Sequence, residues 1–198
     1  MMLRLARVYA LSGALCLSAS AWAAPGDPAQ GRAKAQALAC VACHGEAGQS
    51  SQAGVPHLAA QPPLSIFYQL LQFRDQRRRG GGMEAIAANL SEQDMRDLAA
   101  YFSQLPAPKG QPFADAALVR QGEQLAQAQF CSSCHGNQLQ GQKHVPRLAG
   151  QRADYFLTQL QHLHSGERAD MDGTMASAAA SLSPADMAAL SAYAQTLN

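Results

Sequence analysis

Two five-residue stretches of the chain have the residue types and the spacing to hold the same prosthetic group. Residues 40–44 (CVACH) and 131–135 (CSSCH) both read Cys-x-x-Cys-His, the attachment pattern for a c-type haem. Two thiols on one helical turn can each add to a vinyl group of one porphyrin, and the adjoining histidine can then ligate the iron. The sequence therefore predicts two covalently bound haem c groups, attached through Cys40, Cys43, Cys131 and Cys134 and ligated by His44 and His135.

Other uses of paired cysteines fit the sequence less well. A disulfide within one helical turn closes almost no loop, so it would stabilise little. A zinc ribbon needs about 15–20 residues between its two cysteine pairs, and Cys43 and Cys131 lie much further apart. A thioredoxin-like motif needs a βαβ setting, and no strand pattern surrounds either motif.

Residues 1–23 have the features of a secretory signal peptide. Arg4 and Arg7 give a positive start, an apolar run covers residues 8–17, and residues 21–23 (AWA) offer a small-x-small cleavage site. The apolar run is too short to cross a membrane, although an uncleaved N-terminal anchor is an alternative. Cys16 is expected to leave with the signal, so that the four remaining cysteines all belong to the two haem motifs.

The charge of the exported chain is close to balanced. Removing Arg4 and Arg7 from the 15 basic residues leaves 13, against 14 acidic residues. Haem propionates would add negative charge. The near-neutral charge gives no sign of a strongly basic face, so we expect no nucleic-acid partner.

The two halves of the chain match well beyond the haem motifs. Residues 55–61 (VPHLAAQ) match residues 145–151 (VPRLAGQ), and residues 94–101 (DMRDLAAY) match residues 186–193 (DMAALSAY). The repeat is about 90 residues long, which indicates two small domains rather than a solenoid.

Three prolines within residues 106–112 interrupt the pattern between the copies, and they indicate a stiff linker. We therefore expect a signal peptide over residues 1–23, domains over 24–105 and 115–198, and a linker over 106–114.

Each copy has the sequence pattern of a few short helices. Helices are expected over residues 29–40, from Pro63 onward and over residues 153–163, because apolar residues recur at helical spacing. Ser91 and Ser183 are expected to cap the last helix of each copy. The predicted fold class is all-α, with two tandem domains. Each domain has so thin a core that a haem must supply much of its apolar mass.

A second axial ligand is expected from methionine, because a soft thioether favours ferrous iron. Met83 and Met175 occupy matching places in the repeat, each seven residues before a Leu-Ser pair. Met171 is a competitor in the second copy, whereas Met95 and Met187 fit core positions better. Bis-histidine ligation remains an alternative, with the other histidines being His57, His144, His162 and His164.

Several matched residues are expected to support the haem sites. The carbonyls of Pro56 and Pro146 are candidate acceptors for the ligating histidine rings. Their neighbours His57 and Arg147 are candidates to neutralise a propionate. Gly31 and Gly122, with Tyr101 and Tyr193, are expected to form a close crossing of the first and last helices.

Residues 74–82 contain four arginines and three glycines. This run is either a docking patch for an acidic partner or, as we prefer, a solvated loop.

Taken together, these motifs and their order resemble the dihaem cytochrome c4 family over nearly the whole mature chain. The resemblance implies two class I cytochrome c domains about a pseudo-twofold axis, with haem propionates facing each other. It also implies a periplasmic carrier that moves electrons from the cytochrome bc complex to a haem-copper terminal oxidase. The family's cysteines, proximal histidines and distal methionines fall on Cys40, Cys43, His44, Met83, Cys131, Cys134, His135 and Met175.

The preferred hypothesis is a mobile two-haem electron carrier that is not itself an enzyme, because no nucleophile, general base or open coordination site is evident. The alternative is a dihaem subunit of an enzyme complex, such as the partner of a flavin-containing sulfide dehydrogenase. A dihaem peroxidase would need a displaceable axial ligand and a longer chain. Peripheral association with a membrane is an alternative to free diffusion.

Overall fold

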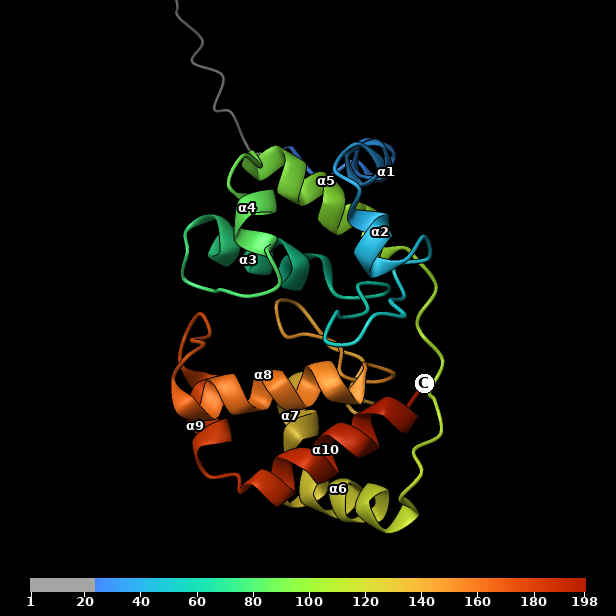
Figure 1. The fold of residues 1–198 in the computed structure, drawn as a ribbon, viewed down its shortest axis with the longest axis vertical. Coiled ribbons are helices and arrows are strands. Elements are labelled where there is room, and N and C mark those ends of the chain that lie inside the picture. Colours follow the sequence, from blue (N-terminus) through green and yellow to red (C-terminus); the bar gives the residue numbers. More distant parts are fainter. Residues whose placement is uncertain (1–23) are drawn as a thin grey trace, which may run out of the picture.

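The computed structural model describes residues 24–198. This part of the chain contains ten α-helices and, apart from one isolated bridge between Gln142 and Val145, no β-structure. The helices form two groups of five that are stacked one above the other (Figure 1). The all-α expectation is confirmed. The expected signal peptide and Cys16 lie outside the described residues.

The first group is called here the first domain. Its helices are α1 (Pro28–Ala37), α2 (Cys40–His44), α3 (Pro63–Arg74), α4 (Met83–Ala87) and α5 (Glu92–Ser103). Helix α5 packs on both α1 and α3, so it is the central helix of this domain.

The second domain repeats this order. Its helices are α6 (Ala116–Ala128), α7 (Cys131–His135), α8 (Ala153–Ser165), α9 (Thr174–Ala180) and α10 (Pro184–Thr196). Helix α10 packs on α6 and α8 as α5 packs on α1 and α3. Every helix-to-helix contact within residues 24–198 stays inside one domain, so the two domains meet through loops and side chains.

The helix expected over residues 29–40 is shorter, and the haem motif forms a separate helix. Helix α1 ends at Ala37, and α2 begins at Cys40 after Ala39 adopts a left-handed conformation with φ of 52°. Phe130 makes the same break before α7, also with φ of 52°. The break turns the Cys-x-x-Cys-His segment away from the preceding helix, a change of direction that helical periodicity does not reveal.

The close crossing of first and last helices is confirmed in both domains. A Cβ atom at Gly31 would overlap the backbone carbonyl of Asp97 on α5, and one at Gly122 would overlap the carbonyl of Ala189 on α10. Only glycine allows the backbones to approach this closely. Ser91 and Ser183 form capping boxes with Asp94 and Asp186, as predicted.

Each domain has a core of its own. Met95 and Met187 are buried in the first and second cores respectively, which confirms that they are core residues. Between the domains, residues 104–115 contain no helix and run along one side of the molecule (Figure 1). Hydrogen bonds hold this segment to both domains, from Gln49 to the Pro106 carbonyl at 3.2 Å and from the Gln111 amide to the Gln195 carbonyl at 2.9 Å. None of the helices in the described chain is both long and apolar enough to cross a membrane.

Candidate haem sites

The histidine of each Cys-x-x-Cys-His motif is buried and has a fixed orientation. His44 Nδ1 lies 3.0 Å from the carbonyl oxygen of Pro56, and His135 Nδ1 lies 2.8 Å from that of Pro146. A carbonyl oxygen only accepts, so Nδ1 must carry the hydrogen. The predicted carbonyl acceptors are confirmed, and the Nε2 lone pair of each ring is left free to bind a metal.

Burial keeps both rings neutral. It lowers the pKa of His44 and of His135 below the usual value for histidine, and it outweighs the opposite effect of the proline carbonyls. A neutral imidazole can ligate iron without first losing a proton.

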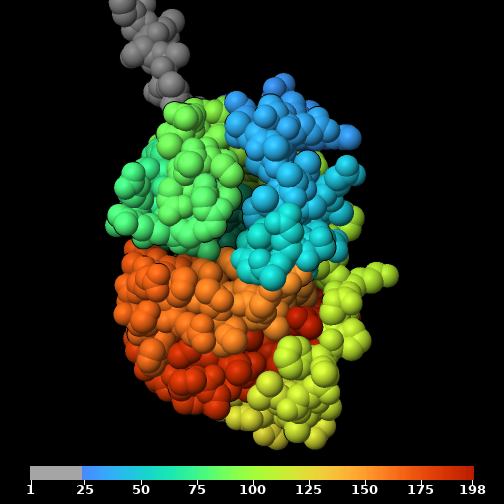
Figure 2. Space-filling model, in the orientation of Figure 1, coloured from blue at the N-terminus to red at the C-terminus, as the bar shows by residue number. Residues whose placement is uncertain are grey.

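Both candidate sites open into one continuous cavity of about 370 Å³. Cys40, Cys43, His44 and Met83 line it from the first domain, and His135 and Met175 line it from the second. The surface of the first domain is visibly hollowed beside this region, between the segments near residues 40 and 80 (Figure 2). The fold thus brings each predicted methionine to the same cavity as the histidine of its own domain.

The competing residues lie in less suitable places. Met171 is 47% exposed. The His164 ring is hydrogen-bonded to the Ala179 carbonyl at 3.0 Å, and His144 packs edge-on against Tyr68. His57 and His162 line the cavity, but the His57 ring accepts the Ser50 amide hydrogen at 2.9 Å, and His162 Nε2 lies 3.6 Å from the Glu167 carboxylate. Met83 and Met175 therefore remain the best-placed distal residues.

Comparisons with known proteins agree with this geometry. Residues 26–102 match the family described as cbb3-type cytochrome c oxidase subunit III, and residues 119–198 match the cytochrome c family. A cytochrome c4 from Thiocapsa roseopersicina is 41% identical over 184 residues, which cover 87% of this chain and 94% of that protein. The chain belongs to the cytochrome c4 family.

Solved structures show the same two-domain arrangement. The crystal structure of reduced cytochrome c4 from Pseudomonas stutzeri has a TM-score of 0.79 and 34% identity, covering 87% of this chain and all of that one. A thiosulfate dehydrogenase (TsdBA) from Marichromatium purpuratum has a TM-score of 0.77 and 29% identity, over 86% of this chain and 40% of that one.

Membership of the cytochrome c4 family identifies the chain as a dihaem electron-transfer cytochrome with covalently bound haem c. The residues of this structure fit that group. None of the four motif cysteines forms a disulfide, and burial raises the pKa of the Cys40 and Cys131 thiols. These thiols would attach haem c, and the oriented histidines and the methionines in the cavity wall are the side chains that would hold its iron. When bound, haem supplies an iron that exchanges one electron at a time.

The interface between the two domains contains reciprocal hydrogen bonds that the sequence analysis missed. Gln61 donates from Nε2 to the Arg147 carbonyl at 2.9 Å, and its Oε1 accepts from the Arg147 amide at 3.0 Å. Gln151 makes the same pair of bonds, both at 2.9 Å, with the backbone of His57. These bonds use only the backbone groups of His57 and Arg147, so the neutralisation of a propionate by their side chains stays a prediction.

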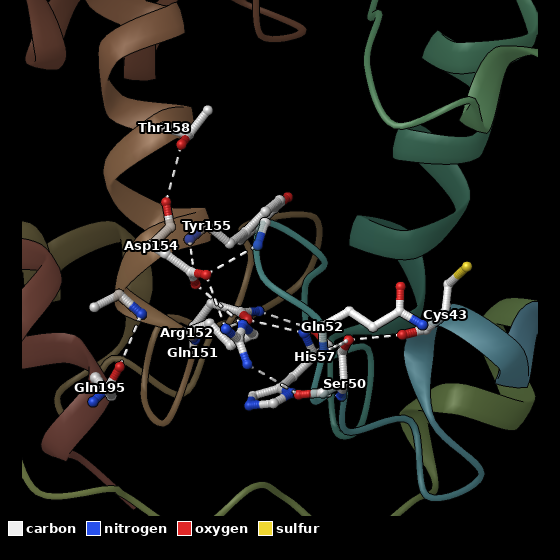
Figure 3. A network of polar contacts seen from close by, with 12 residues as sticks. Cys43, Ser50, Gln52, His57, Gln151, Arg152, Asp154, Tyr155, Thr158 and Gln195 are labelled. Atoms are coloured by element: carbon white, nitrogen blue, oxygen red, sulfur yellow. Dashed lines mark hydrogen bonds and ion pairs between the residues drawn. The ribbon is translucent and has the colours of Figure 1, made fainter.

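A second set of contacts links the first haem motif to the second domain (Figure 3). Ser50 donates from Oγ to the Cys43 carbonyl at 2.7 Å, and its carbonyl accepts from Arg152 at 3.4 Å. Asp154, at the start of α8, accepts from the Gly54 amide at 3.0 Å. Among the described residues, the two bonds that cross between the domains have no counterpart in the repeat, whereas the Cys134 carbonyl accepts from Gln142 at 2.9 Å much as the Cys43 carbonyl accepts from Ser50.

The prediction that residues 74–82 form a solvated loop is wrong for Arg78. Arg78 is only 7% exposed and donates to Tyr155 of the second domain at 2.8 Å, whereas Arg77 and Arg79 are exposed. The repeat contained the signal for this role, because Arg78 and Arg168 each follow a matched glutamine, Gln69 or Gln159, by nine residues.

Proposed function

We propose that the chain is a mobile two-haem electron carrier in which His44 and Met83 ligate one iron and His135 and Met175 ligate the other. The observation that carries this proposal is that each histidine has its Nδ1 hydrogen committed to a proline carbonyl, in a cavity that the matching methionine also lines. A haem iron held by a histidine and a methionine in each domain would have no vacant site for substrate. It would exchange electrons without bond formation.

Two further features support the carrier role. Histidine–methionine ligation raises the reduction potential, which suits a protein that accepts electrons from a quinol-oxidising complex. The domains are held together by the Gln61 and Gln151 contacts, so one chain presents two such centres at a fixed separation. We place the domains at residues 24–105 and 115–198, with the linker at 106–114.

The proposed setting is the periplasm, with the cytochrome bc complex as donor and a haem-copper oxidase as acceptor. The signal-like features of residues 1–23 support export of the chain. In membranes that lack the protein, adding the purified holoprotein should restore quinol-dependent oxygen uptake. Failure to restore it, with an intact two-haem protein, would contradict these partners.

Redox titration of the holoprotein tests the carrier chemistry. It should show two haems per chain, two high potentials, and the red absorption band of iron–methionine bonding. Low potentials without that band would indicate bis-histidine ligation and would overturn the ligand proposal.

A second candidate function is electron acceptance within an enzyme complex. It is favoured by the structural match to 40% of the thiosulfate dehydrogenase chain, which shows this fold joined to additional protein. A catalytic subunit that co-purifies with the chain, and that reduces it in the presence of thiosulfate or sulfide, would support this function over the mobile carrier.

A further inference from the structure

Five polar side chains from both domains form one hydrogen-bonded cluster inside the interface: Gln69 on α3, Arg78 after α3, Tyr155 and Gln159 on α8, and Arg168 after α8. Arg78 donates to Gln69 Oε1 at 2.6 Å in its own domain and to Gln159 Oε1 at 2.9 Å in the other. Arg168 mirrors it, with bonds of 2.7 Å to Gln159 and 3.0 Å to Gln69. Each glutamine oxygen therefore accepts from both arginines.

This cluster contains two positive charges and no negative one. Neither arginine forms a salt bridge with any residue in the 24–198 range. Arg78 lies over the Phe73 ring, with its guanidinium carbon 4.6 Å from the ring centre. The Nε atom of Arg168 is buried without a hydrogen-bond partner. Burial, together with the charge of Arg78, lowers the pKa of Arg168 to about 10, against the opposite effect of Tyr155 and Asp170, and this still leaves Arg168 charged at neutral pH. The Asp170 carboxylate forms no salt bridge with Arg168; it accepts from the Met175 and Ala176 amides.

Two buried like charges are costly unless an anion joins them. All five residues line the cavity into which both candidate haem sites open. A guanidinium offers paired donors that match a carboxylate. Tyr155 accepts from Arg78 at 2.8 Å, so its own hydroxyl hydrogen remains available for an anion. The missing partner is therefore a carboxylate that enters through the cavity.

The carboxylates that haem c itself carries are its propionates. We propose that Arg78 and Arg168 form one shared anion site that binds propionates of both haems and thereby couples the two centres electrostatically. Because the hydrogen bonds of each arginine reach both domains, the charge of either one acts on both irons. This inference rests on the proposed two-haem carrier function.

The coupling has a definite sign. A nearby positive charge disfavours the ferric state, which carries more positive charge than the ferrous state. A propionate that keeps its charge but loses its arginine would stabilise ferric iron further. Removing one arginine should therefore lower the potential of both haems, including the haem of the domain that was not altered.

The test compares Arg78→Gln and Arg168→Gln with Arg77→Gln in the holoprotein. Arg77 is the exposed neighbour of Arg78 and serves as the matched control. Both potentials are measured by spectroelectrochemical titration, and propionate vibrations by resonance Raman spectroscopy. We expect either cluster variant to reduce the equilibrium constant for reduction of both haems by about tenfold, a shift of about 59 mV for one electron, and to shift the propionate vibrations. Arg77→Gln should change neither.

A shift confined to the haem of the altered domain, or no shift in either haem, would overturn the shared site. If Arg78→Gln binds less than two haems, Arg78→Lys decides the question. Lysine keeps the positive charge but lacks the paired N–H donors of a guanidinium. Arg78→Lys should therefore preserve both potentials within about twofold in the equilibrium constant for reduction and still alter the propionate vibrations. Unaltered vibrations would overturn the proposal. The wild-type protein separates these outcomes from failure of the proposed ligation. If methionine did not ligate the irons, the red iron–methionine absorption band would be absent from the wild-type protein.

Discussion

Replacing Gln61 with alanine should weaken the attachment of the two domains to each other. The side chain is buried and makes two hydrogen bonds across the interface, of 2.9 and 3.0 Å, to the backbone of Arg147. Truncation leaves one N–H and one C=O group of Arg147 without these partners. Gln151→Ala does the same to His57 and also removes a 3.0 Å bond from the Arg152 amide.

The magnitude follows from the number of polar groups left unsatisfied. Each buried donor or acceptor that loses its partner costs about 1–3 kcal/mol. With two such groups, and with some relief from water entering the space, Gln61→Ala should lower the free energy of unfolding by about 2–4 kcal/mol. Gln151→Ala should cost at least as much.

The assay is guanidinium-induced unfolding of the holoprotein, followed by circular dichroism. Gln127→Ala is the matched control, because Gln127 is exposed on α6 and its replacement should change stability by less than about 0.5 kcal/mol. If Gln61→Ala and Gln151→Ala were as stable as this control, the reciprocal glutamine contacts would not hold the domains together.

Two further predictions concern the helices of the first domain. Gly31→Ala should lower the free energy of unfolding by about 2–3 kcal/mol, measured by thermal melting, because its Cβ would overlap the Asp97 carbonyl; Gln36→Ala, exposed on the same helix, should not, and equal stability of the two would refute the close crossing. The Lys34 ammonium, 2.7 Å from Asp94, holds the pKa of that carboxyl below its usual value. Its stabilisation should be present above the unfolded pKa of about 3.9 and disappear as the pH falls below it. Asp94→Asn should therefore flatten the acid limb of a melting-temperature profile, and an unchanged limb would contradict this assignment.

Local features of this protein could be predicted from the sequence because they depend on nearby residues. The capping boxes at Ser91 and Ser183 and the start of α3 at Pro63 follow from short-range backbone chemistry. The histidine–proline contacts could also be predicted, because residues 55–61 and 145–151 repeat in register with the haem motifs. The break at Ala39 could not, since a left-handed alanine has no propensity signal.

The contacts between the two domains could not be predicted from the sequence, because they depend on how the domains are placed relative to each other. Arg78 stands between two exposed arginines and before three glycines, so composition alone indicates a solvated loop. Its burial results from Gln159 and Tyr155 in the other domain, which lie about 80 residues away in the chain. Matched glutamine–arginine spacing in the two copies was the available signal, but it does not say that the bonds cross between domains.

The most direct test of the proposed function is the red iron–methionine absorption band in Met83→Ala and Met175→Ala. Each methionine lines the cavity that the histidine of its own domain also lines. Each variant should therefore lose about half of the band and lower the potential of one haem, while the other haem keeps its ligation. Met171→Ala, at an exposed position, should keep the whole band. Full retention of the band in both Met83→Ala and Met175→Ala would show that other residues ligate the irons.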